Sequence, residues 1–301
     1  MAHTLAFLLR PLGKAVHPVR LTGIAALFVL GSGQVVADNS ISAELIERSG
    51  IGEHLALVPD SIVHEAWPKH QSCYSGADSA LFSMDEAAFN ELITMYFGVE
   101  QSTARAVQAM SDFMNVKQLY GTKKFFDSDL GQRIVAAEKA SKEIEEDEFV
   151  VIAEEYFDSE QWTEERELLI RVVYEATRAA RFVSILNGEL SVAVAVTGHC
   201  EPSLDSYKEL SNSLKTTRTD ARMIEPIMAN DLVLIIATIF RDFSDKDMIE
   251  YAEFARSAEG KSFFNALLES TRKAIAGGLK GARADLISQY AESLSTAEAA
   301  D

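Results

Sequence analysis

The chain has 301 residues, of which 48% are hydrophobic, and it carries 46 acidic against 28 basic residues. This length is sufficient for one large domain or two small domains with a real core. A formal net charge of −18 repels phosphate backbones and anionic membrane surfaces. We therefore expect no nucleic-acid partner.

Residues 1–37 have the pattern of a bacterial secretory signal peptide. Three basic residues and no acidic ones accompany an apolar stretch over residues 21–30, and small residues up to Ala37 offer a cleavage site before Asp38. The apolar stretch is shorter than the roughly 20 residues of a membrane-spanning helix, so we expect cleavage rather than an uncleaved anchor. The mature chain, with a net charge of −21, is then periplasmic or secreted, without stable membrane insertion. The basic residues are Arg10, Lys14 and Arg20.

Helical patterns follow one another through the first half of the mature chain. Apolar residues recur at three- and four-residue spacing, and Gly, Pro and polar runs separate the helices. The expected elements are a helix over 41–58 interrupted at Gly50 and Gly52, a helical turn over 61–67 before Pro68, a loop over 69–78, a helix opened by a capping box of Ser83 and Glu86, and a helix over 99–114.

The second half is also expected to be helical, with one ambiguous region. Asn187-Gly188 lies between short apolar runs, which is a hairpin signal, whereas the Ala- and Leu-rich surroundings favour a helix. Both interpretations stay open. The other expected elements are a helix over 163–186, a polar helix from Pro202 to about residue 222, a helix from Pro226 with a buried portion at 232–240, and a frayed tail over 293–301.

Two helix–turn–helix units, 129 residues apart, share the same cap signals. Ser244 begins the second unit as an N-cap with Asp247 in the box position, as Asn115 and Gln118 do in the first. Within each unit a serine caps the second helix and a glycine follows inside it, where glycine costs about 1 kcal/mol relative to alanine unless a backbone packs closely. We therefore predict tight crossings at both glycines. The identical pairs are Lys117 and Lys246, Phe125 and Phe254, Ser128 and Ser257, Gly131 and Gly260, Ala137 and Ala266, and Ser141 and Ser270.

The pattern F-x-x-S-x-x-G before an amphipathic helix resembles the signature of a bacterial family, domain of unknown function 2059. The resemblance is strongest over residues 232–290, and the opening AELIERSGIGEHLALVP is also similar to the start of such proteins. Family copies often have proline after the capping serine, where this chain has Asp129 and Ala258. The resemblance implies a small, exported, helical protein with no established activity and no catalytic residues.

These patterns predict an all-α helical bundle with two pseudo-duplicated halves. The halves comprise residues 38–160 and 161–301, joined around 158–163. The alternative to a duplication is that any two capped amphipathic helices look this similar.

Cys73 and Cys200 are the only cysteines. In an oxidising periplasm a Cys73–Cys200 disulfide is the default, and two buried free thiols are the alternative. A structural zinc site is a further possibility, since His70 and His199 lie near the two thiols, although adjacent His199 and Cys200 would have difficulty pointing at one tetrahedral centre.

No sequence motif for catalysis, nucleotide binding or metal-dependent hydrolysis is present. We therefore predict no catalytic, cofactor-binding or metal-ligating residue. The first functional hypothesis is a non-catalytic interaction or structural module with protein partners. The alternative is a carrier that holds a small apolar ligand or lipid between its helices, and a hydrolase is the third.

Overall fold

The computed structural model describes residues 33–73, 84–200, 203, 205–208, 210, 223 and 225–298. These residues form helices joined by short turns, without a strand, so the all-α prediction is confirmed. The helices are α2 (Gly33–Arg48), α3 (Ile51–Ala56), α4 (Val58–Cys73), α5 (Glu86–Phe97), α6 (Val99–Phe113), α7 (Val116–Phe126), α8 (Asp129–Lys142), α9 (Glu146–Phe157), α10 (Glu164–Thr177), α11 (Ala179–Thr197), α13 (Glu225–Ile239), α14 (Asp245–Arg256) and α15 (Ala258–Glu298).

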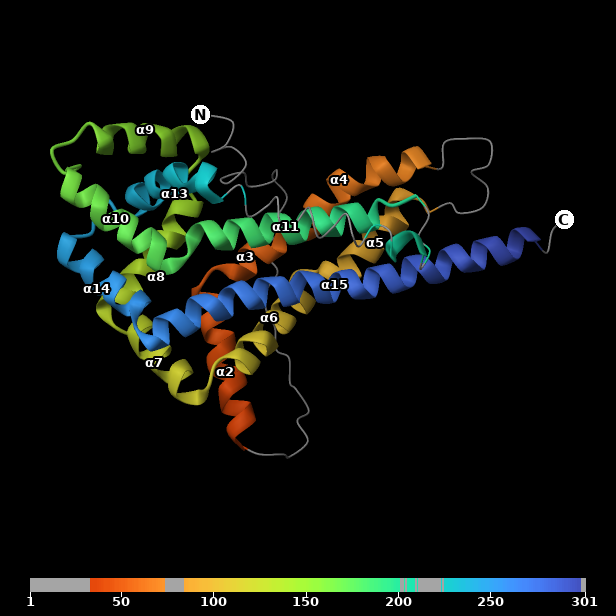
Figure 1. Ribbon diagram of the computed structural model, residues 1–301, viewed down its shortest axis with the longest axis horizontal. Coiled ribbons are helices and arrows are strands. Elements are labelled where there is room, and N and C mark those ends of the chain that lie inside the picture. The colour runs from red at the N-terminus through yellow and green to blue at the C-terminus, as the bar shows by residue number, and fades with distance from the viewer. Residues whose placement is uncertain are drawn as a thin grey trace.

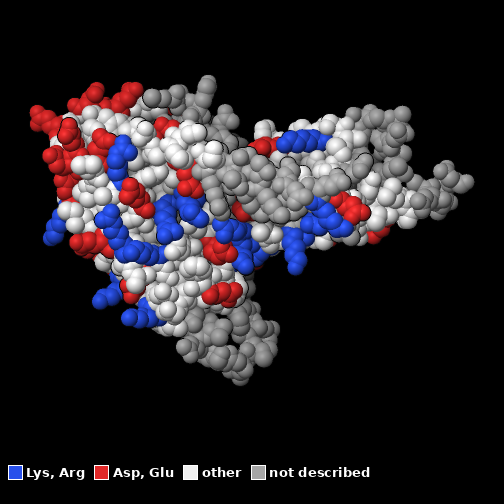
Figure 2. Space-filling view, in the orientation of Figure 1, with Lys and Arg blue, Asp and Glu red and all other residues white. Residues whose placement is uncertain are grey.

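The helices form a broad cluster at one end of the molecule and a narrower bundle toward the other. Helices α7 to α10, α13 and α14 lie in the cluster, whereas α11 and the long α15 run from it along the longest axis, with α4 and α5 at the far end (Figure 1). Acidic side chains gather over the outer edge of the cluster, where α9 and α10 each begin with three acidic residues (Figure 2).

A single main hydrophobic core joins both halves of the chain. Buried side chains from Ile41 in α2 to Leu286 in α15 belong to one continuous cluster. Helix α15 packs most extensively on α6, and α11 packs on both α15 and α4. The expected junction at 158–163 therefore does not separate two cores, because helices from both sides bury the same apolar surface.

The two helix–turn–helix units form nearly identical corners. Both predicted capping boxes, at Asn115 and at Ser244, are present. The second-helix caps are present too, since Ser128 Oγ accepts from the Gly131 amide at 3.1 Å and Ser257 Oγ accepts from the Gly260 amide at 3.0 Å.

The glycines occupy the crossings that the pattern predicts. A Cβ added at Gly131 would overlap the Phe125 carbonyl oxygen and lie 2.6 Å from Phe126 Cα. A Cβ at Gly260 would likewise overlap the Phe254 carbonyl oxygen. The neighbouring backbone is the last turn of the preceding helix, so each glycine allows its own corner to close.

The two corners also pack against each other. Phe125 and Phe254, which occupy the same position in each unit, stack with ring centroids 3.7 Å apart and planes 2° from parallel. Arg133 Nη2 pairs with Asp247 Oδ1 at 2.6 Å, and this guanidinium, together with the Ser244 hydroxyl, holds the pKa of Asp247 well below its usual range. The corners share geometry, and the duplication of the halves stays a prediction.

Small residues close the contact between α15 and the α5–α6 pair. A Cβ at Gly278 would lie 2.7 Å from the Tyr96 carbonyl oxygen, and one at Gly277 would lie 2.5 Å from Arg105 Cδ. Arg105 Nε donates to the Ala274 carbonyl at 3.0 Å, and Tyr96 donates its hydroxyl proton to Asp285 at 2.6 Å. This part of the bundle is therefore fastened by close backbone approach and by hydrogen bonds.

Several predicted boundaries are wrong in the first half. Helix α4 continues through Pro68 to Cys73, so residues 69–73 are not a loop. Pro68 and His64 are exposed, so water can reach the carbonyl that proline leaves without a donor, while buried Ala66 and His70 hold the helix on the core. Asp85, rather than Ser83, caps α5 by accepting from the Ala88 amide at 2.8 Å, and Ser83 lies outside the described residues.

Of the two helix interruptions expected at Gly50 and Gly52, one is present and the other is not. The expected interruption occurs at Gly50, whose φ of 66° separates α2 from α3. Gly52 lies inside α3, so no interruption occurs there. Residues 1–32 of the expected signal peptide lie outside the described residues, and the first five residues of α2, from Gly33 to Ala37, precede the expected cleavage site.

The second half differs from expectation in three places. The helix expected over 163–186 ends at Thr177, because Arg178 adopts a left-handed conformation (φ 60°) that redirects the chain into α11. Asn187-Gly188 lies inside α11, which settles the ambiguity in favour of a helix. The tail is helical to Glu298, where hydroxyls such as Ser293 Oγ bond back to carbonyls one turn earlier. The helix expected over 202–222 lies largely outside the described residues, although residues 205–208 are helical.

Candidate ligand cavity

The clustered end of the bundle contains a cavity of about 310 Å³ between its helices, and this cavity is partly open to solvent. Its wall is made by the α2–α3 junction and by residues from α7, α8, α10, α11, α13, α14 and α15. Both corners contribute a phenylalanine, Phe126 from the first and Phe263 from the second. The close crossings at Gly131 and Gly260 therefore position two aromatic rings of the wall.

Polar and apolar residues occupy different parts of the wall. The α2–α3 junction and α8 supply most of the polar side chains, whereas α11, α13 and the first turns of α15 supply almost exclusively aliphatic and aromatic ones. The cavity is thus amphipathic. The polar lining residues are Arg48, Ser49, His54, Glu138, Ser141, Lys142, Thr177 and Tyr251; the apolar lining residues are Ile51, Phe126, Val173, Ala179, Phe182, Val183, Leu232, Ile235, Ile236, Ile239, Phe240, Phe263, Phe264, Leu267 and Leu268.

Glu138 lies on the core-facing side of α8, one turn after the fully buried Ile134. Burial raises the pKa of its carboxyl group to about 7, and the nearby Lys142 ammonium opposes this shift. Among the residues that the structure describes, no hydrogen bond or ion pair reaches this carboxylate. Glu138 is therefore an ionisable group on the cavity wall that lacks a protein partner in that part of the chain.

Tyr251 of α14 lies near Glu138 on the same wall. The side chain is 3% exposed, and its ring stacks on Phe125 with centroids 6.1 Å apart. Burial raises the pKa of its hydroxyl well above the usual value, and the negative charge of Glu138 raises it further. Within the described ranges no hydrogen bond joins this hydroxyl to another group. Tyr251 therefore stays protonated and has a hydrogen-bonding oxygen to offer.

His54 of α3 is the second titratable group of the polar part. Burial lowers its pKa to about 4; Lys142 lowers it further and Glu53 opposes this. Its ring meets that of Phe182 edge-on, with centroids 5.6 Å apart. His54 is therefore neutral at pH 7 and adds no positive charge to the cavity.

The two cations of the polar part are already paired. Lys142 Nζ binds Glu53 Oε2 at 2.7 Å, and Arg48 Nη2 binds Asp127 at 2.8 Å and also Glu44. These pairs lie at the outer margin of the cavity, where Glu53 and Asp127 are substantially exposed. These ion pairs border the polar part of the cavity, and none of them includes Glu138.

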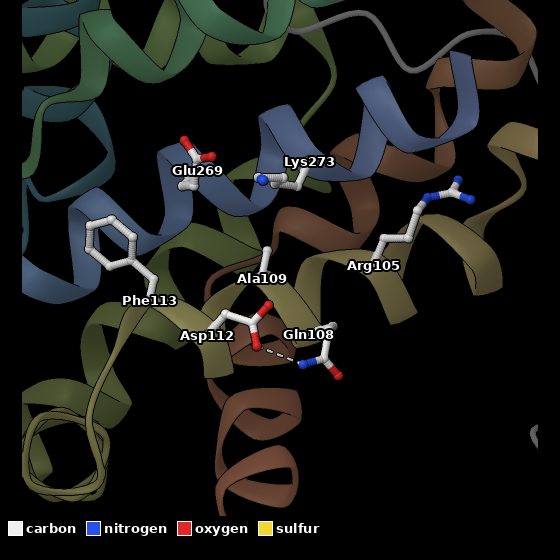
Figure 3. Close-up of a pocket in the computed structure, with 7 residues that line it drawn as sticks. All are labelled: Arg105, Gln108, Ala109, Asp112, Phe113, Glu269 and Lys273. Atoms are coloured by element: carbon white, nitrogen blue, oxygen red, sulfur yellow. Dashed lines mark hydrogen bonds between the residues drawn. The ribbon is translucent and has the colours of Figure 1, made fainter. Parts of the chain in front are cut away.

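A second hollow is a surface groove between α6 and α15 (Figure 3). Gln108 donates to Asp112 at 2.8 Å, and Glu269 pairs with Arg272 at 2.8 Å. The Arg105 guanidinium points away from the groove toward backbone carbonyls of α5 and α15 (Figure 3). Most polar groups of this groove are therefore used within the protein, and the interior cavity is the stronger candidate site.

The structure separates the predicted site residues into two places. Cys73 and Cys200 form the expected disulfide, with Cα atoms 5.2 Å apart, at the opposite end of α11 from the cavity. Both thiolates of the alternative zinc site are consumed by this bond, and the described residues contain no cluster of three or more His, Cys, Asp or Glu that could hold a metal. The structural-motif residues shape the corners and do not line the cavity; they are Ser128, Gly131, Ser257 and Gly260.

Sequence reasoning did not identify Glu138, His54 or Tyr251. For Glu138 a signal existed, since a carboxylate four residues after Ile134 and seven after Gly131 falls on the helix face that packs inward. The partners of that face come from distant helices, which a linear pattern does not reveal.

The fold and the cavity together define the class: an all-α bundle with an amphipathic cavity between its helices. Comparison of the chain with protein-family models, with curated proteins and with solved structures found no match.

Proposed function

We propose that the protein is a non-catalytic carrier that binds a small, largely apolar ligand in the cavity between α3, α8, α11, α13 and α15. The observation that supports this function is the cavity itself, whose volume of about 310 Å³ falls within the range of small-molecule sites. Its lining is mainly apolar with a few converging polar groups, which is the usual composition of such sites.

An exported location is part of the proposal. The leader-like residues 1–37 and the Cys73–Cys200 disulfide both fit an oxidising compartment such as the periplasm. By length and composition, α11 is the one described helix that could cross a membrane, but it packs against α4, α13 and α15. A core position accounts for its apolar character, and we propose that the mature chain does not insert. The resemblance to family 2059 and the hypothesis of protein partners stay predictions.

Ligand binding can be tested with a fluorescent reporter and matched variants. The neutral dye N-phenyl-1-naphthylamine should bind wild-type protein with enhanced emission, and 1-decanol should displace it. The double variant I236W/L267W places two bulky rings in the cavity and should weaken dye binding at least tenfold. Circular dichroism verifies folding, and either single variant replaces the double one if it does not fold.

The control places the same two rings on the outside of the bundle. Ile227 and Leu168 are 75% and 65% exposed, so I227W/L168W should bind the dye like wild type. Dye affinity that is insensitive to the cavity variant, or absent in the wild type, would overturn the proposed function.

A further inference from the structure

We propose that the ligand is an apolar amine, whose protonated amino group binds Glu138 and Tyr251 while its hydrocarbon body fills the space between α11, α13 and α15. The inference rests on the proposed function, since it names the chemical class that the same cavity takes.

The two parts of the wall require an amphiphile. An alkyl or aromatic body gains contact with Phe182, Ile236 and Leu267, and each buried methylene contributes about 0.8 kcal/mol in transfer from water. A ligand without a polar group would leave the Glu138 carboxyl and the Tyr251 hydroxyl facing hydrocarbon, which is costly. The ligand therefore carries one polar group at the α8 side.

The charges around the polar part select the sign of that group. Arg48 and Lys123 share Glu44 and Asp127, and Lys142 is held by Glu53. Each of these three cations is therefore matched by a carboxylate. Among the described residues that line the polar part, Glu138 is the carboxylate without an ion-pair partner, so this part carries one unpaired negative charge when Glu138 is ionised. A cation on the ligand compensates it.

The available hydrogen-bonding atoms favour an ammonium group. An ammonium has three donors and no acceptor, and both the Glu138 carboxylate and the Tyr251 hydroxyl oxygen can accept from it. A ligand carboxylate would instead face the Glu138 carboxylate. An alcohol could satisfy either group with its single proton but would add no charge. The acidic surface, with a chain charge of −18, also favours the approach of cationic molecules.

The test compares three probes with the same ten-carbon chain: decylamine, 1-decanol and decanoate. At pH 8, where Glu138 is ionised, decylamine should bind at least tenfold more tightly than decanol, as expected for a charge-assisted hydrogen bond, and decanoate should bind most weakly. Isothermal titration below the aggregation concentration of each probe gives the affinities. Glu138→Gln should reduce the preference for decylamine to about threefold or less while leaving decanol affinity nearly unchanged.

Glu143→Gln removes an exposed carboxylate five residues away and should leave all three affinities unchanged. Tyr251→Phe should weaken decylamine more than decanol. Equal affinities for decylamine and decanol, or a preference for decanoate, would overturn the amine inference and leave the carrier function standing. Absence of binding by all three probes and by the dye would overturn both.

Discussion

The two ends of α15 show how one helix can either leave space or exclude it. Near its start, Phe263, Phe264, Leu267 and Leu268 face other large side chains and border the cavity. Further along, glycines such as Gly278 bring the helix backbone against α5 and α6. Large branched and aromatic side chains do not interlock completely where several helices converge, whereas small residues allow two helices to touch.

The two ends of the molecule contain different structural features. The narrow end contains the disulfide, the Arg105 hydrogen bonds and the close approach of α15 to α5 and α6 at Gly277 and Gly278. The clustered end contains the cavity with Glu138 and Tyr251, whose side-chain oxygens have no hydrogen-bond or ion-pair partner among the described residues. We expect changes at the narrow end to alter the free energy of unfolding and changes at the clustered end to alter binding.

The largest expected effect is loss of the disulfide. Replacing both Cys73 and Cys200 by serine should lower the free energy of unfolding by about 4 kcal/mol, because the bond closes a loop of more than a hundred residues in the unfolded chain. Urea unfolding measures the change. Dye affinity should stay within about twofold at low denaturant. An unchanged urea midpoint would contradict the stabilising role, and a lost cavity would contradict the separation of the two ends.

One titratable group at each end, His70 and Glu138, should make stability depend on pH with opposite sign. His70, at the narrow end, packs against Phe89 with ring centroids 5.2 Å apart, and burial lowers its pKa to about 4. Between pH 6.5 and 4 the unfolded chain binds the extra proton, so stability falls as the pH falls. His70→Gln should remove roughly 3 kcal/mol of this dependence, whereas the same change at exposed His64 should have little effect.

Glu138 gives the opposite slope. Its pKa is about 7 in the folded state and near 4.5 in the unfolded chain, so the folded state binds more protons between these values and stability falls as the pH rises. Glu138→Gln should remove roughly 3 kcal/mol of that loss. Urea unfolding at pH 4.5, 5.5, 6.5 and 7.5 measures both slopes. If the two substitutions changed the pH dependence of the unfolding free energy in the same direction, the opposite signs assigned to His70 and Glu138 would be wrong.

The smallest expected effect concerns the glycine contact. Gly278→Ala should destabilise the protein by about 2 kcal/mol, because the new methyl group would meet the Tyr96 carbonyl oxygen at 2.7 Å and the Phe97 ring at 2.9 Å. Gly52→Ala is the matched control: its nearest neighbour would be Thr103 Oγ1 at 3.8 Å, so alanine should be neutral or stabilising by up to about 1 kcal/mol. Thermal unfolding compares the two variants. Equal melting temperatures would show that α5 moves to accommodate the methyl group on α15.

The sequence predicted the fold best where local chemistry determines it. The capping boxes at Asn115 and Ser244 and the crossings at Gly131 and Gly260 depend on residues close in the chain. The break at Arg178 was missed because a non-glycine residue adopts the left-handed conformation there, and no turn residue marks it. Packing of α10 and α11 on different neighbours determines that bend.

The candidate site was less predictable than the fold. The disulfide followed from the number of cysteines and the expected compartment, so it was predicted correctly. The cavity combines side chains separated by more than two hundred residues, such as His54 and Leu267, and its volume depends on how their helices cross. The carrier hypothesis named an interhelical cavity but could not locate it or assign Glu138 to it.

The bond between Cys73 and Cys200 closes the intervening chain, which includes α5 to α11, into a covalent ring. Two arms, α2 to α4 and α13 to α15, extend from this ring at the disulfide. A protease that cuts the ring once produces no separate fragment until a reductant opens the sulfur bridge. A single cut in either arm leaves the piece beyond it without a covalent link to the rest of the chain. In a compartment rich in proteases, the middle of this polypeptide therefore keeps its covalent continuity after a single nick, and its arms do not.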